Sequence, residues 1–296
     1  ETDVIERDAK ITVLPYGSLT KGEKGKELSD LEDLAKKVVA FSDDGKCVND
    51  LGLLKEGMIR AKALNKVIAS HAEAEGLGDT PLAEIKAVER ELSLAKQTGV
   101  KYHFCHLSTA ESLSLVKDAK REGIDVTCEV TPHHIAMIAL DKTNANFKMN
   151  PPLREKKDVL ATIEAIVNGV ADFIATDHAP HTRAEKTDFL HAPNGSIGME
   201  TSFAAAYTAL VKTGVLTFTE LIEKMSVRPA ELLGIEAGAI GAGEVADIAL
   251  IDEHEAWVVD PEKLHGKSRN TPFKGMTLTG RVKATVCGGR VVFNEL

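Results

Sequence analysis

Short apolar runs alternate with amphipathic segments along most of this 296-residue chain. Strands are predicted at 11–14, 38–41, 67–70, 100–105, 125–130 and 172–176. Helical spacing follows them at 28–37, 51–64, 80–97, 108–121 and 158–167, and again at 202–212 and 218–225. Parallel strands need long crossover connections, and helices usually provide them. The pattern therefore predicts an α/β protein whose parallel strands are covered by helices.

Ionisable side chains follow almost every predicted strand. They are Asp44, His71, His106, the pair His133 and His134, and Asp177. The carboxyl ends of the strands in a parallel (β/α) barrel converge on one face, where such folds carry their chemistry. Taken singly, Asp44 reads as a turn residue before Gly45, and the histidines read as buried core residues. Taken together, the two acids and two imidazoles suit zinc or another divalent ion. We expect Asp44, His71, His106 and Asp177 to be metal ligands.

Three neighbouring side chains are expected to be structural. His133 and His134 are adjacent in the chain. Side chains at adjacent strand positions point to opposite faces, so at most one of the two can reach the barrel mouth. The same argument turns Cys105 away from His106, and packing is its expected role.

The stretch IATDHAPHT, at 174–182, ends an apolar run in an acid and two imidazoles. One interpretation is a strand end followed by a solvated loop, with His178 and His181 exposed. The alternative assigns Asp177 a catalytic role. A divalent metal lowers the pKa of bound water, and a nearby acid can pass the proton to a leaving nitrogen. The predicted chemistry is metal-assisted hydrolysis of an amide-like carbonyl, or its reverse.

Composition narrows the class of protein. The formal charge of -9 argues against a nucleic-acid or anionic-membrane surface. Four scattered cysteines without a CxxC pair are typical of reduced thiols, and we expect a cytoplasmic protein.

After about residue 233 the sequence pattern changes to short β-rich runs with glycine turns. Domains are expected at 1–233, the barrel, and 234–296, a small β module. The segment 185–196 is expected to be a mobile surface loop.

Seven motifs carry a resemblance to a known family. They are FSDDG (41–45), SHAE (70–73), CHLST (105–109), EVTPHH (129–134), NFKMNPPLR (146–154), ATDHAPHT (175–182) and GMET (198–201). In this order they resemble dihydroorotases of the class I bacterial type, in the amidohydrolase superfamily. The resemblance implies a (β/α)8 TIM-type barrel, of which strands three to eight lie in this chain. It also implies that 234–296 is the C-terminal part of an accessory β-sandwich.

The resemblance also implies a reaction and its residues. The reaction is the zinc-dependent, reversible cyclisation of N-carbamoyl-L-aspartate to L-dihydroorotate in pyrimidine synthesis, with one or two metal ions. Asp44 matches a bridging carboxylate, and His71 and His106 match metal imidazoles. Asp177 matches a ligand that doubles as general base, while Asn150 and His181 match substrate-holding positions. A homodimer, or a complex with aspartate carbamoyltransferase, would suit the family.

Two departures from the family pattern leave alternatives open. The chain has no His-x-His pair with its following arginine, and the stretch after His71 is short. We expect strands one and two to lie before Glu1, so that this chain alone binds metal weakly. A hydantoinase or allantoinase is disfavoured by Asp44, because those enzymes resemble the superfamily but bridge their metals with a carboxylated lysine. A non-catalytic subunit that assembles with aspartate carbamoyltransferase is the other alternative.

Overall fold

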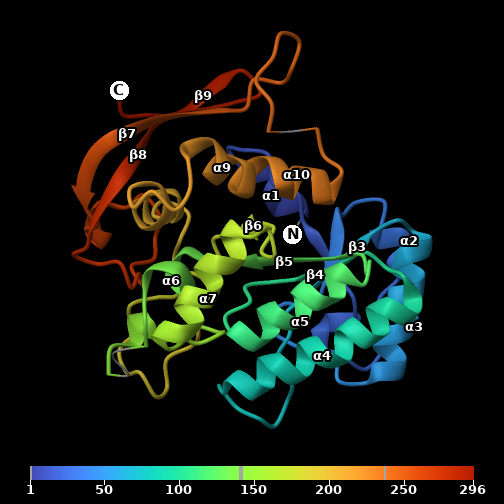
Figure 1. The fold of residues 1–296 in the computed structure, drawn as a ribbon. Coiled ribbons are helices and arrows are strands. Elements are labelled where there is room, and N and C mark those ends of the chain that lie inside the picture. The colour runs from blue at the N-terminus through green and yellow to red at the C-terminus, as the bar shows by residue number, and fades with distance from the viewer. Residues whose placement is uncertain (1, 140–142, 237) are drawn as a thin grey trace.

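The computed structural model describes residues 2–139, 143–236 and 238–296. Six parallel strands form one sheet in the order of the chain, β1 to β6 (Figure 1). Their bounds are β1 Tyr16–Ser18, β2 Ala40–Ser42, β3 Val67–Ser70, β4 Tyr102–Phe104, β5 Val126–Val130 and β6 Phe173–Ile174. β1 and β6 are the two edge strands of this sheet. The predicted α/β class and the parallel pairing are confirmed.

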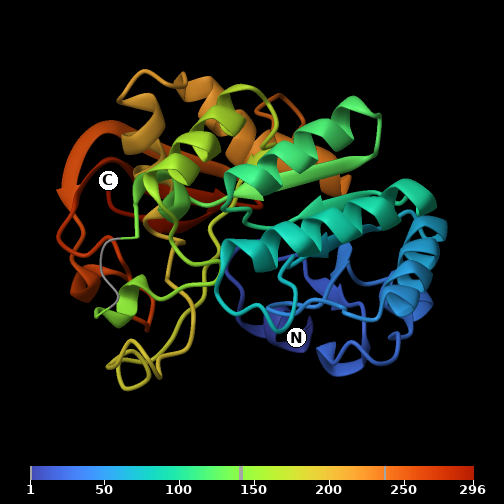
Figure 2. The same ribbon diagram turned by 60° about the horizontal axis from the view of Figure 1, so that its bottom comes forward.

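Four helices lie side by side on the outer face of the sheet (Figures 1 and 2). They are α3 Leu51–Ala63, α4 Pro81–Thr98, α5 Ala110–Arg121 and α7 Lys156–Val167. α4 begins with Pro81 at its first position and ends at Gly99, whose φ of 64° suits glycine. Their apolar faces pack on Tyr102 and Phe104 of β4. Alternate residues of β4 therefore point to the other, inner face.

Shorter helices complete this body. They are α1 Thr2–Asp8, α2 Leu31–Leu34, α6 Pro132–Ala136, α8 Ser202–Ala206, α9 Phe218–Ile222 and α10 Arg228–Leu233. Single π-helical segments at 207–211 and 223–227 continue α8 and α9. Three-residue 3₁₀ turns lie at 21–23, 145–147 and 261–263. The helix expected at 28–37 is shortened to α2.

The strand expected at 11–14 is not formed. β1 begins just after Pro15, whose ring removes a backbone N–H from any ladder. The Pro15 carbonyl instead accepts a hydrogen bond from the Val39 N–H, 3.1 Å away. The side chains of 11–14 are all exposed, so their β-branched composition was a misleading signal.

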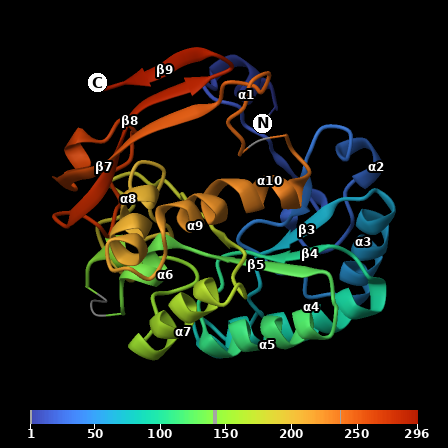
Figure 3. The same cartoon turned by 45° about the horizontal axis from the view of Figure 1, so that its top comes forward.

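The C-terminal β-rich segment forms a separate antiparallel sheet of β7 Ile248–Val258, β8 Thr277–Cys287 and β9 Arg290–Asn294. Gly288 and Gly289, with φ of 55° and 75°, make the tight turn between β8 and β9. Figure 3 shows this sheet as a layer beyond α8 and α9. A second apolar cluster, which includes Met149, Ala205 and Phe273, joins it to the α/β body. The boundary at 233 stays a prediction.

Candidate active site

His71 and His106 meet at the carboxyl ends of β3 and β4. The His71 Nδ1 lies 3.0 Å from the His106 Nε2, and the ring centroids are 4.7 Å apart. Both side chains are buried. Burial and the neighbouring His71 hold the pKa of His106 well below its usual value, so this ring is neutral. Two nitrogens bound to one zinc at about 2.0–2.1 Å lie roughly 3.3 Å apart, close to the separation seen here.

The backbone is strained at two of the predicted site residues. His106 has φ of 39° and Asp177 has φ of 48°, both in the left-handed region. Residues other than glycine seldom adopt this conformation, and it costs on the order of 1–3 kcal/mol. Such strain clusters at functional sites, where it aims a side chain that a regular strand would direct elsewhere. His106 comes two residues after the end of β4 at Phe104, and Asp177 comes three residues after the end of β6 at Ile174.

Asn150 joins the imidazole pair from the loop after α6. Its Nδ2 lies 3.0 Å from the His71 Nε2 and donates to the Glu73 carboxylate at 2.6 Å. Burial tends to raise the pKa of Glu73, but hydrogen bonds from His71 and Asn150 lower it overall. Glu73 therefore stays ionised beside His71. The Asn150 Oδ1 is buried without a hydrogen-bond partner in the described structure.

Asp177 lies beside His133. The Asp177 Oδ2 is 3.8 Å from the His133 Nε2. Burial, reinforced by the charge of Glu129, raises the pKa of Asp177 to about 7. The carboxyl group can therefore carry a proton near neutral pH, as a residue that moves a proton in catalysis must. The expected catalytic role of Asp177 remains a proposal, and its setting is compatible with that role.

The expectation that His133 and His134 continue a strand is wrong. Thr131 caps α6, and both histidines lie in that helix. The His134 ring bonds the Thr131 hydroxyl (2.8 Å) and the Pro151 carbonyl (3.0 Å), which is a structural role. His133 instead reaches Asp177. The missed signal was Thr131-Pro132, the same start pattern that correctly marked the helix after Thr80.

Asp44 follows Asp43 at the end of β2. Asp43 is buried, and its carboxylate accepts hydrogen bonds from the Thr20 N–H (2.9 Å) and hydroxyl. Asp44 is exposed, and its charge contributes to the raised pKa of Asp177. Of the two consecutive acids, Asp43 therefore holds the loop and Asp44 remains available to a ligand.

His181 and His178 are placed differently from the imidazole pair. The His181 Nε2 donates to the Asn194 carbonyl at 2.8 Å. The His178 Nδ1 accepts a hydrogen bond from the Gly198 N–H at 3.0 Å, so this ring is not simply solvated. Both rings line a cavity of about 530 Å³. Lys186 holds the loop beyond them, because its Nζ donates to three backbone carbonyls.

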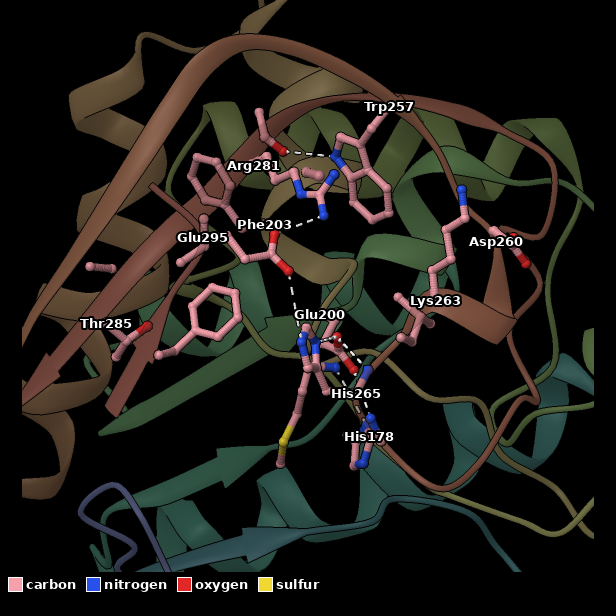
Figure 4. A pocket seen from close by; sticks show the side chains of 18 of the residues that line it. His178, Glu200, Phe203, Trp257, Asp260, Lys263, His265, Arg281, Thr285 and Glu295 are labelled. Carbon is pink, nitrogen blue, oxygen red and sulfur yellow. Dashed lines mark hydrogen bonds and ion pairs between the residues drawn. The ribbon is translucent and has the colours of Figure 1, made fainter. Parts of the chain in front are cut away.

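A larger cavity, of about 680 Å³, lies against the antiparallel sheet (Figure 4). Glu200 accepts a hydrogen bond from the His265 ring, and Arg281 lies over the Trp257 ring at 5.5 Å. Neither His71 nor His106 lines it. The strand-end groups, and not this cavity, have the chemistry of a reaction centre, and we place the candidate site there.

The donor chemistry at the strand ends suits a metal. Within the described residues only the two imidazoles of the predicted set meet, and neither Asp44 nor Asp177 forms with them a group of three donors within 4.8 Å of one another. Three buried side-chain atoms at this site lack a hydrogen-bond partner within the described ranges: His106 Nδ1, His133 Nε2 and Asn150 Oδ1. Buried polar atoms are rarely left unpaired, so several at one place indicate that a further group belongs there. Neutral imidazoles and carboxylates are ligands that zinc accepts.

Comparisons with known proteins show the family of this chain. Residues 18–292 match the amidohydrolase family. The chain is 42% identical to a dihydroorotase of Bacillus caldolyticus and 40% identical to one of Bacillus subtilis strain 168. Each match covers 98% of this chain and 73% of the relative.

Solved structures give the architecture. An L-hydantoinase from Arthrobacter aurescens superposes with a TM-score of 0.84 at 26% identity, over 95% of this chain and 70% of that one. A D-hydantoinase, at 24% identity and a TM-score of 0.81, covers 91% of this chain and 68% of that one and shares the fold. These enzymes are TIM-type barrels, as predicted for this chain. Among the described helices, none is long and apolar enough to cross a membrane.

Proposed function

Because this chain belongs to the amidohydrolase family and, within it, to the dihydroorotases, we propose that it catalyses the reversible cyclisation of N-carbamoyl-L-aspartate to L-dihydroorotate. The observation that carries the proposal is the meeting of His71, His106 and Asn150 beside a carboxyl group, Asp177, whose pKa is raised to about 7. This arrangement occurs in a hydrolase of cyclic amides, and it supplies both metal ligands and a group that can move a proton.

We assign the metal ligands to Asp44, His71, His106 and Asp177, and propose zinc, one ion or two. When bound, the metal supplies a water of lowered pKa and polarises the amide carbonyl. In the hydrolytic direction, water oxygen bonds to the ring carbonyl carbon and the carbon–nitrogen bond breaks. Asp177 takes the proton of the attacking water and returns it to the departing ureido nitrogen. Cyclisation reverses these steps and releases water.

Asn150 and His181 are proposed to hold the substrate. The Asn150 Oδ1 is free to accept a hydrogen bond from an N–H of the ring. His181 would meet the substrate carboxylate, and its Asn194 partner fixes the ring that does so. His133, held neutral by burial, lies beside Asp177 without adding a positive charge there. Positioning of this kind can contribute much of the rate, because reacting groups are held in line.

The wider setting is also a proposal. A cytoplasmic enzyme of pyrimidine synthesis fits the free thiols of the described cysteines and a chain charge of -9. A homodimer, or assembly with aspartate carbamoyltransferase, is the partnership we propose. The antiparallel sheet, within 234–296, is proposed to be part of an accessory β-sandwich beside the barrel of 1–233.

The experiment compares two substrates on the zinc-supplemented protein. Dihydroorotate hydrolysis and N-carbamoyl-L-aspartate cyclisation are followed by chromatography, with hydantoin as the competing substrate, because solved relatives include hydantoinases. We expect slow turnover of dihydroorotate, because the chain has no His-x-His pair, and a further loss of about 10²–10⁴-fold in Asp177→Asn. Glu253→Gln, on the exposed surface of β7, should retain activity. Preference for hydantoin, or equal rates in Asp177→Asn and the parent, would overturn the assignment. A folded protein without either activity would support the non-catalytic subunit.

A further inference from the structure

Three metal-ligating side chains meet on the inner face of the sheet, apart from the imidazole pair. His103 and Cys105 are alternate residues at the end of β4, so they point to the same side. The ladder pairs His103 with Thr127 and Phe104 with Cys128, which brings Cys105 beside Glu129 of β5. Their donor atoms, His103 nitrogen, Cys105 sulfur and Glu129 oxygen, all lie within 4.8 Å of one another.

The His103 ring is already oriented as a metal ligand would be. Its Nδ1 lies 2.8 Å from the Thr127 hydroxyl, while its Nε2 faces the Glu129 Oε2 at 3.2 Å. A histidine that binds metal through one nitrogen usually donates the other N–H to a fixed oxygen, which sets its tautomer and direction. The Thr127 hydroxyl supplies that oxygen, and the ring itself is only 2% exposed.

The other two donors are free to adjust. Within the described part of the chain, the Cys105 sulfur has no hydrogen-bond partner. Both Cys105 and Glu129 are half-buried. Donors around one zinc ion, bound at about 2.0–2.3 Å, lie roughly 3.3–3.8 Å apart. Side-chain rotations that move the Cys105 and Glu129 donor atoms by about 1 Å would therefore bring the three donors around one ion.

A simple ion pair between His103 and Glu129 leaves the cysteine unexplained. The opposite face of β4 carries Tyr102 and Phe104, which pack in the apolar core. Cys105 is on the inner face, beside the polar side chains of His103 and Glu129. A sulfur donor beside an imidazole and a carboxylate matches the preferences of zinc and cobalt(II), and excludes the harder magnesium and calcium ions.

We propose that His103, Cys105 and Glu129 form a second, thiolate-containing site for a zinc-like divalent ion. Three protein ligands leave a fourth position for water. The site differs from the strand-end centre in its donors, and it does not depend on the proposed dihydroorotase activity. The thiol proton passes to solvent as the metal binds.

The test uses cobalt(II) on the metal-free chain, because a thiolate bound to cobalt gives a charge-transfer absorption in the near ultraviolet that imidazoles and carboxylates do not. Bound equivalents are counted by equilibrium dialysis in the same samples. We expect the absorption in the parent protein, and its loss together with one equivalent of metal in Cys105→Ser. Cys287→Ser, which changes a half-buried cysteine of β8, is the matched control and should keep both.

Two further variants separate this site from the strand-end centre. The double change His71→Ala with His106→Ala should keep the absorption. Thr127→Val should keep it but weaken cobalt binding about 10–100-fold, as losses of a supporting hydrogen bond do. Should Cys105→Ser fail to fold, Glu129→Gln serves in its place, with the same loss expected. No absorption in the parent, or an absorption that survives Cys105→Ser, would overturn the proposal.

Discussion

The raised pKa of Asp177 predicts an unusual pH dependence of stability in the metal-free protein. The change to make is Asp177→Asn, which keeps the shape of the side chain and removes its titration. The folded carboxyl group holds its proton up to a pKa of about 7, mainly because it is buried, while the usual value is 3.8. Between these values the folded chain binds more protons than the unfolded chain. The free energy of unfolding therefore falls as pH rises through this window.

The magnitude follows from the size of the shift. A pH of about 5 is two units below the folded pKa of Asp177. At about 1.36 kcal/mol per unit, the proton bound in the folded state then adds about 2.7 kcal/mol to the free energy of unfolding. That stabilisation is lost by about pH 8. The charge of Glu129 contributes to the shift after burial. We expect the parent protein to lose about 2–3 kcal/mol more than Asp177→Asn between these two pH values.

The measurement is urea unfolding of both metal-free proteins at several pH values, followed by far-ultraviolet circular dichroism. Subtracting the curve of the Asp177→Asn protein from the parent curve cancels the titration of all groups that the two proteins share. A difference that is constant with pH within about 0.5 kcal/mol would refute the reasoning, because a carboxyl group with an ordinary pKa is ionised throughout this range.

Three further predictions follow from other contacts. Zinc affinity should fall about fivefold from about pH 7 to pH 6, because the proton on Asp177 competes with the metal. A competition titration that finds the same fall in Asp177→Asn would contradict this. Lys186→Met removes three hydrogen bonds from Nζ to backbone carbonyls and so loosens the loop that positions His181. The KM should rise about tenfold while kcat is kept. Unchanged hydrogen exchange over 182–196 would argue against this. Glu84→Gln breaks a buried network with Arg154 and should lower the free energy of unfolding by about 3–5 kcal/mol, measured with urea. Glu111→Gln, at an exposed ion pair, should lower it by under about 1 kcal/mol. Similar losses for both variants would contradict the burial argument.

Local signals in the sequence predicted the α/β body well. The strand expected at 67–70 is β3, and the helix expected after Thr80 is α4. In these elements the hydrophobic periodicity, the capping residues and the glycine or proline residues at the ends all favour the same structure. The strand predicted at 11–14 does not form, although the run contains β-branched residues, because it precedes Pro15, which has no backbone N–H for a ladder. Strand formation depends on pairing as well as on propensity. Tyr16, after the proline, pairs with Ala40, whereas residues 11–14, before it, lie in no strand.

The candidate site was predicted only in part, because its support comes from residues distant in sequence. Glu84 lies on α4, where acids at helical spacing usually face solvent. In the structure its carboxylate accepts hydrogen bonds from the backbone N–H groups of Ser108 and Thr109, just after His106. Such a partnership depends on how α4 lies across the strand ends. Neither periodicity nor motif spacing carries that information.

Strand alternation places the Cys105 side chain on one face of the sheet but leaves its role open. The sequence places Cys105 and His106 on opposite sides, and the structure agrees that they face different groups. In a two-layer sheet, the side away from a site is normally a packed core. Here the helices pack against Tyr102 and Phe104, and the other side carries His103, Thr127 and Glu129. Strand alternation thus tells which face of the sheet a cysteine lies on. Whether the cysteine packs in a core or binds a metal depends on the other residues of that face.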